Sequence, residues 1–221
     1  MTWVFNRSVN DNVLIAGWFL EARKPHPDWS RYLDVSIVLG EGTRSLSADE
    51  MPRQFFIDEK PRALPDMFMG SSGKWVVSET ARQVIEELDP GLHQFFSIDV
   101  QFRDGTAPDG VWYAMNITML KKEMIDAESA IKHSVTKDQT FTSKSGVTKT
   151  KKGHEMFLVD FDAKRITVGP DADDGANLWR EKGHQRDLIL FSDKLHDTLR
   201  DAELTTAKYF AASAFSNVKE F

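Results

Sequence analysis

Cysteine is absent from the 221 residues of the chain. The chain can therefore have no disulfides, no thiolate zinc site and no cysteine nucleophile, and its stability must come from packing. Long hydrophobic runs are also missing, because stretches such as 13–16 fall far short of the roughly 18 residues that a membrane-spanning helix needs. The hydrophobic content of 41% is nevertheless ordinary for a globular protein, so we expect one packed domain over 1–221.

Positive charge is in the minority, and the formal net charge is -6 at pH 7. An acidic protein repels the phosphate backbone, which argues against a nucleic-acid partner and favours a basic protein partner. Polar residues interrupt the apolar ones in 1–22, and no small-residue cleavage site follows. We therefore expect no membrane partner and a cytoplasmic location.

Enzymatic signatures are also lacking. The six histidines never occur at the paired i, i+4 spacing of a helical metal site. GSSGK at 70–74 and GEGTRS at 40–45 lack the full spacing of nucleotide-binding loops, and DADDG at 171–175 is one residue short of a calcium loop. We predict no metal, no cofactor and no catalytic residue. An enzyme with an unrecognised active site and a non-catalytic adaptor protein remain alternatives.

The first third of the chain has the pattern of strands separated by turns. Apolar segments lie at 3–5, 13–20 and 33–39, the last with the alternating sequence LDVSIVL. This pattern predicts an N-terminal β-rich subdomain over 1–62, arranged as an antiparallel meander. A second region then spans 63–221.

Two segments of the second region share one pattern, at 74–96 and at 188–210. In each, a short apolar strand ends in a serine, Ser78 or Ser192, that can cap the helix that follows. The helical residues of the first segment have apolar positions at one-sided spacing, and paired aromatic residues begin a further strand. The sequence therefore predicts an α+β fold: a mostly antiparallel sheet with two strand-helix-strand repeat units.

A basic stretch interrupts the acidic chain at 130–153. It contains six lysines against the single acid Asp138, a local charge of 6 minus 1, or +5. Few aromatic residues lie near it that could stack on bases, so we interpret it as a solvated hairpin tip rather than a nucleic-acid site.

The two segments, in this order and spacing, resemble the bacterial polymorphic-toxin immunity proteins of family eleven, a former domain of unknown function. A further match is YAMNITMLKKEMIDAESA, where Asn116, Asp126 and Ser129 stand where the family has its Asn, Asp and Ser. LWREKG is similar to the family's aromatic-Arg-x-Lys-Gly element, with Trp179 at the aromatic position. The resemblance covers about 66–212. It implies that the chain is no enzyme and binds and neutralises a cognate toxin by stoichiometric occlusion.

A basic toxin would be attracted by acidic surface, and the sequence offers two such regions. The first comprises the polar sides of the two repeat helices, and the second is the acidic turn that precedes the second unit. We therefore predict that the partner-binding residues are Glu79, Glu86, Glu87, Asp89, Asp171, Asp173, Asp174, Asp193, Asp197 and Asp201.

Overall fold

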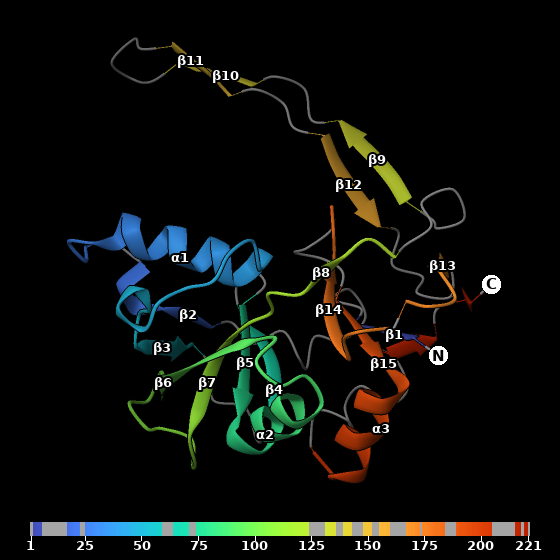
Figure 1. The fold of residues 1–221 in the computed structure, drawn as a ribbon. Coiled ribbons are helices and arrows are strands. Elements are labelled where there is room, and N and C mark those ends of the chain that lie inside the picture. The colour runs from blue at the N-terminus through green and yellow to red at the C-terminus, as the bar shows by residue number, and fades with distance from the viewer. Residues whose placement is uncertain are drawn as a thin grey trace.

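The structure is a computed structural model. It describes residues 2–5, 17–22, 25–58, 64–70, 74–123, 131–135, 139–142, 148–151, 155–159, 167–172, 174–183, 189–204, 215–217 and 219–220. These residues form helices and strands in two main sheets, so the predicted α+β class is confirmed (Figure 1).

The larger sheet has six strands in the order β2-β3-β6-β7-β5-β4. Strands β3 and β6 run parallel, and the other neighbours run antiparallel. The strands are β2 (Gly17–Phe19), β3 (Gln54–Ile57), β4 (Met67–Gly70), β5 (Lys74–Ser78), β6 (Gln94–Phe102) and β7 (Trp112–Asn116).

The smaller sheet has five strands in the order β16-β1-β15-β14-β8, and β14 and β8 run parallel. It joins both ends of the chain, because β1 lies between β15 and β16. The strands are β1 (Thr2–Phe5), β8 (Leu120–Lys121), β14 (Leu178–Glu181), β15 (Ile189–Ser192) and β16 (Phe215–Asn217).

Three two-stranded ladders complete the described strands. They are β9 (Ile131–Val135) with β12 (Glu155–Val159), β10 (Gln139–Thr142) with β11 (Thr148–Lys151), and β13 (Thr167–Val168) with β17 (Lys219–Glu220). The antiparallel ladders β9–β12 and β10–β11 place the predicted hairpin in the lysine-rich stretch, where they form the arm at the top of Figure 1.

The prediction of a strand at 33–39 is wrong, because these residues lie in helix α1 (Trp29–Glu41). Val35, Val38 and Leu39 are buried at helical spacing, whereas Leu33 and Ile37 are exposed. The apolar residues alternate in the sequence because the exposed side of this helix also carries aliphatic side chains. Gly42 ends the helix in the left-handed conformation, with φ of 65° and its N–H bonded to the Val38 carbonyl.

Within 1–62 the strands are divided between the two sheets, since β1 lies in the smaller one and β2 and β3 in the larger one. Two short 3₁₀ turns, η1 (Leu20–Ala22) and η2 (Ala48–Glu50), flank this part of the larger sheet. In Figure 1, α1 lies above the six-stranded sheet and α2 (Glu79–Leu88) lies below it.

The two strand-helix junctions have the same local geometry. Ser78 ends β5 and its hydroxyl accepts a hydrogen bond from the Ala81 N–H at the start of α2. Ser192 ends β15 and accepts from the Leu195 N–H at the start of α3 (Asp193–Asp201). Both predicted caps are confirmed. The first helix leads into β6, whereas 205–210 lie outside the described residues.

The hydroxyl of each capping serine also donates a hydrogen bond to the residue that precedes a neighbouring strand. The Ser78 hydroxyl lies 2.8 Å from Asp66 Oδ1, and the Ser192 hydroxyl lies 2.7 Å from Asn177 Oδ1. Asp66 precedes β4 and Asn177 precedes β14. Each serine thus ties a helix start to a hairpin partner of its own strand.

We expect Ser78→Ala and Ser192→Ala each to destabilise the protein by about 1 kcal/mol, because each removes a cap and a side-chain hydrogen bond. Urea unfolding followed by circular dichroism measures the change. Thr80→Ala, at an exposed position of α2, is the matched control. Equal stability of the cap variants and the control would show that the caps contribute little.

Candidate functional site

No group of three or more histidine, aspartate or glutamate side chains is placed to hold a metal ion among the described residues. No described helix is both long and apolar enough to cross a membrane. The predicted acidic residues belong to α2 and its C-terminal end, to α3 and to the segment before β14.

On α2, Glu87 is exposed, while Glu79 and Glu86 are partly exposed. Arg82 holds Glu79 through two hydrogen bonds of 2.9 and 2.8 Å. These bonds, with one from the Tyr113 hydroxyl, lower the pKa of Glu79 to about 2. Glu86 accepts a bond from the Gly91 N–H. All three carboxylates border solvent, and Glu79 is ionised at neutral pH.

On α3, Asp201 is exposed, while Asp193 and Asp197 are partly exposed. Arg200 pairs with both Asp197 and Asp201, at 2.9 and 3.1 Å. Asp193 accepts a hydrogen bond from the Trp3 indole, which links the start of α3 to β1. Exposed ion pairs such as those of Asp197 and Asp201 contribute little to stability, so contacts with another molecule can replace them at little cost.

The helices α2 and α3 lie side by side at the base of the molecule (Figure 1). The structure therefore brings together acidic residues that are more than a hundred positions apart in the sequence. We call the set Glu79, Glu86, Glu87, Asp193, Asp197 and Asp201 the acidic helix surface.

Asp89 does not lie on this surface, since it is only 2% exposed. Its carboxylate accepts hydrogen bonds from the backbone N–H groups of Asn177 and Leu178 at 2.8 Å and from the Asn177 side chain. His93 lies 3.4 Å away on the other side. Asp89 therefore joins the end of α2, which packs against the larger sheet, to the start of β14 in the smaller sheet.

Burial raises the pKa of Asp89, but its hydrogen bonds to His93 and Asn177 outweigh this and leave the pKa below its ordinary value. A carboxyl group with a lowered pKa stabilises the fold above its unfolded pKa of about 4, and this stabilisation is lost as the pH falls further. We therefore expect the stability difference between the wild type and Asp89→Asn to shrink as the pH falls from 7 to 3. Urea titrations at stepped pH measure it, and a constant difference would contradict this role.

The acidic turn lies elsewhere, next to β8. Asp171 and Asp174 are exposed, and Asp173 lies outside the described residues. The Lys121 ammonium donates to the carbonyls of Ala172 and Asp174, so a cation inside the turn fixes its shape. The structure does not bring this turn into the acidic helix surface, and it remains a separate candidate.

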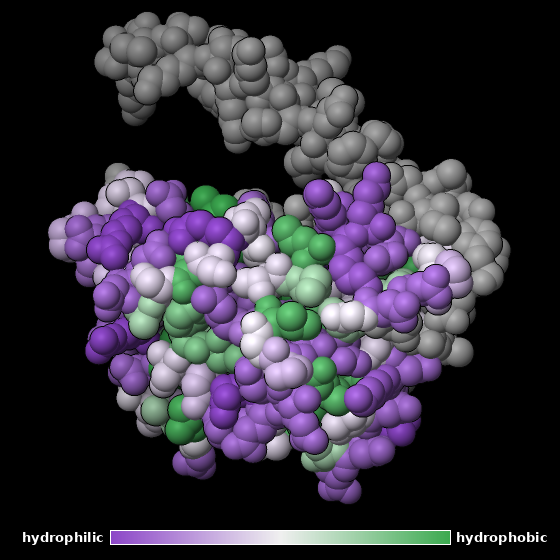
Figure 2. Space-filling view, viewed as in Figure 1, coloured by the Kyte–Doolittle hydropathy of each residue, from purple (hydrophilic) through white to green (hydrophobic). Residues whose placement is uncertain are grey.

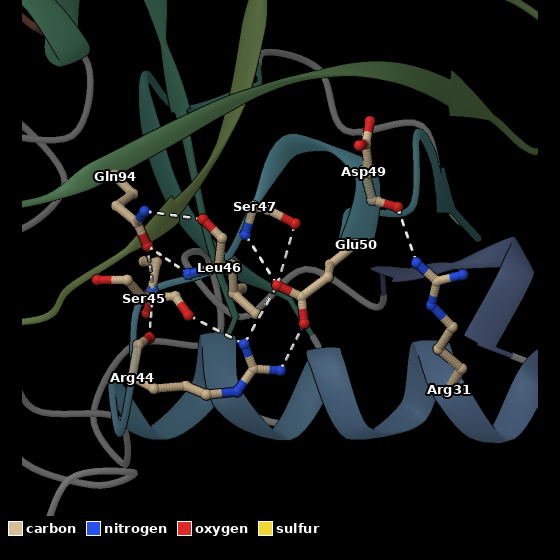
Figure 3. Close-up of polar contacts among 9 residues, drawn as sticks. Arg31, Arg44, Ser45, Leu46, Ser47, Asp49, Glu50 and Gln94 are labelled. Carbon is tan, nitrogen blue, oxygen red and sulfur yellow. Dashed lines mark hydrogen bonds and ion pairs between the residues drawn. The ribbon is translucent and has the colours of Figure 1, made fainter.

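Asn116, one of the residues that carry the family resemblance, lies inside the molecule. Asn116 is fully buried and donates to the Arg44 carbonyl and to Gln94 Oε1. Gln94 in turn holds both the N–H and the carbonyl of Leu46 (Figure 3). Asp126 and Ser129 lie outside the described residues.

The same segment after α1 is closed by an ion pair. Arg44 makes two hydrogen bonds to Glu50, and Glu50 also accepts the Ser47 N–H (Figure 3). These bonds lower the pKa of Glu50 to about 2. Arg31 of α1 donates to the Asp49 carbonyl. The network fixes the connection from α1 to β3.

Arg180 shows the same structural use of a family position. Its side chain is fully buried and donates to the carbonyls of Gly40 and Leu39 at 2.8 and 3.0 Å. Burial lowers its pKa to about 9, whereas Glu41 raises it, so the guanidinium stays cationic at neutral pH. A buried charge from β14 thus neutralises the C-terminal end of α1.

One surface was not predicted. Ladder register puts alternate residues of β2, β3, β6 and β7 on the face of the sheet that carries Tyr113. Arg82 of α2 lies over the Tyr113 ring at 5.3 Å, so α2 covers this face only at one end. The residues of this face on β2, β3 and the second half of β6 are exposed or partly exposed, whereas Met115 of β7 is buried. The open sheet face consists of Trp18, Gln54, Phe56, Ser97, Asp99, Gln101 and Tyr113.

The sequence profile of the Immunity protein family (Imm11) matches residues 20–214, which is most of the chain. The chain belongs to this immunity protein family. No curated protein matches the sequence. The predicted resemblance is thus confirmed, and membership suggests a non-enzymatic role in toxin immunity. Within the matched range, Ser78, Asn116, Arg180 and Ser192 make hydrogen bonds that hold the framework together.

Proposed function

We propose that the chain is an immunity protein that binds one cognate toxin domain and blocks it by stoichiometric occlusion, with the acidic helix surface among its contacts. Family membership supports the toxin as partner.

The observation that carries the proposal is the convergence of α2 and α3. Two helices from distant parts of the chain lie side by side, and both have acidic residues on their solvent sides. An acidic surface attracts a basic partner and speeds its encounter, and the overall charge of -6 acts in the same direction. The proposed partner is therefore a basic toxin domain.

We expect Glu87→Lys with Asp201→Lys to lower the association rate constant for the toxin about tenfold at low salt, because the exchange reverses two exposed charges of the acidic helix surface. The test is a stopped-flow titration at several salt concentrations, with the toxin domain encoded by the adjacent reading frame. Rates that are equal to the wild type at every salt concentration would argue against this surface.

The matched control is Asp34→Lys, which reverses an exposed charge on α1, above the sheet. We expect its association rate to stay within about twofold of the wild type, apart from the small effect of net charge.

A further inference from the structure

We propose that the open sheet face is the core of the toxin-binding surface and that α2 forms part of its acidic rim. This inference rests on the proposed function, because it names the surface on which the toxin binds. It goes further in placing the main contact on strands β3 and β6 and not on the helices.

The open sheet face contains three aromatic side chains. Interface cores are enriched in aromatic residues and arginine, and the residues that dominate binding energy are most often Trp, Tyr and Arg. The open sheet face combines three partly exposed aromatic residues with four exposed polar ones, and Arg82 of α2 lies over one end of it. Phe56 and Trp18 lie with ring centroids 5.3 Å apart, and Tyr113 lies under the Arg82 guanidinium. In Figure 2, hydrophobic atoms reach the surface below α1, in the region where Figure 1 shows β3 and β6.

The two faces of the larger sheet differ in burial along β6. Along β6, Ile98, Val100 and Phe102 point to the opposite face and are between 5% and 6% exposed. Ser97, Asp99 and Gln101 alternate with them and are exposed. A sheet that is packed on one face and partly aromatic on its other face offers a flat binding platform.

Hydrogen bonds fix the side chains where α2 meets the open sheet face. Glu79 accepts hydrogen bonds from Arg82, Gln83 and the Tyr113 hydroxyl. The bond to Glu79 raises the pKa of Tyr113, so the phenol keeps its proton. Side chains fixed in this way lose little entropy on binding.

Charge defines the partner. Among the described residues, the carboxylates on or beside the open sheet face are Asp99, Asp58, Glu79 and Glu86, and the cations beside it are Arg82 and Arg103, which pair with Glu79 and Asp58. Acidic groups therefore outnumber basic ones. The complementary surface has apolar anchors surrounded by lysine or arginine. A basic toxin domain fits this description, whereas a second copy of this acidic chain would bring like charges together.

The test uses the full chain and the toxin domain encoded by the adjacent reading frame. The variant Asp99→Arg with Gln101→Arg changes two exposed residues at the centre of the face, so the fold should be kept; a melting curve checks this. We expect its dissociation constant, measured by titration calorimetry, to rise about a hundredfold. Asp34→Arg on α1 should change it less than about threefold.

A second variant separates the anchor from the charges. Phe56→Ala is expected mainly to raise the dissociation rate, whereas Asp99→Arg should mainly lower the association rate, because apolar anchors hold a complex and charges steer its formation.

Each outcome is decisive. A wild-type chain that does not bind the toxin would overturn the proposed function and this inference together. A wild-type chain that binds, with a folded Asp99→Arg, Gln101→Arg variant of equal affinity, would overturn the inference alone. A concentration-dependent dimer of the free chain that this variant abolishes, seen by light scattering, would reassign the face to a second copy.

Discussion

Replacing Arg180 by alanine is expected to destabilise the protein by about 3–5 kcal/mol, the cost of breaking a buried charged contact. The variant leaves the carbonyls of Leu39 and Gly40 without their donor at the end of α1, in a region closed to water. It also opens a cavity beside β14. The expected result is a large fall in the urea midpoint of unfolding, or poor recovery of folded protein.

Two further substitutions make this result specific. Arg180→Lys should recover only part of the loss, because an ammonium cannot reproduce the two directed bonds of the guanidinium. Arg200→Ala removes an arginine that is about half exposed on α3 and should leave the midpoint almost unchanged. If Arg180→Ala were as stable as Arg200→Ala, the buried arginine would not hold α1.

The second large effect is expected at Asp89. Asp89→Ala should destabilise the protein by about 3 kcal/mol, because it leaves the N–H groups of Asn177 and Leu178 buried without acceptors. Asp89→Asn keeps the size of the side chain and should cost less, since one oxygen can still accept. Chemical denaturation with tryptophan fluorescence measures both.

Asp174→Ala is the matched control for Asp89, because Asp174 is an exposed aspartate of the acidic turn. Its removal should change the free energy of unfolding by less than about 0.5 kcal/mol. An Asp89→Ala variant as stable as this control would show that the contact between α2 and β14 is dispensable.

Local signals were readable from the sequence. The caps Ser78 and Ser192 were predicted because a serine between an apolar strand and a one-sided helix needs only its own neighbours to form the bond. The lysine-rich hairpin was readable for a similar reason, since strand pairing there is between segments close in the chain.

Features that depend on tertiary contacts were not readable. The alternation at 33–39 suggested a strand, but a helix forms because Val35, Val38 and Leu39 pack on one side and Arg180 neutralises its end. Asp89 was expected on the partner surface, and only the fold shows that β14 buries it. The open sheet face depends on the register of β3 with β6, which joins segments far apart in the sequence.

The family positions illustrate the same division. The resemblance marked Asn116 and LWREKG, and both Asn116 and Arg180 in that element make interior bonds that link distant segments. The residues on which the resemblance rests therefore include two that hold the interior together. The surface residues that would choose one toxin, such as Asp99 and Glu87, had no such mark.

The most direct test of toxin neutralisation is a protection assay in a bacterial host. The chain is co-expressed with the toxin domain encoded by the adjacent reading frame, and growth is scored together with the mass of the purified complex. We expect restored growth and a stable 1:1 complex. Killing that persists when the immunity protein is abundant and folded, with no complex recovered, would contradict neutralisation by binding.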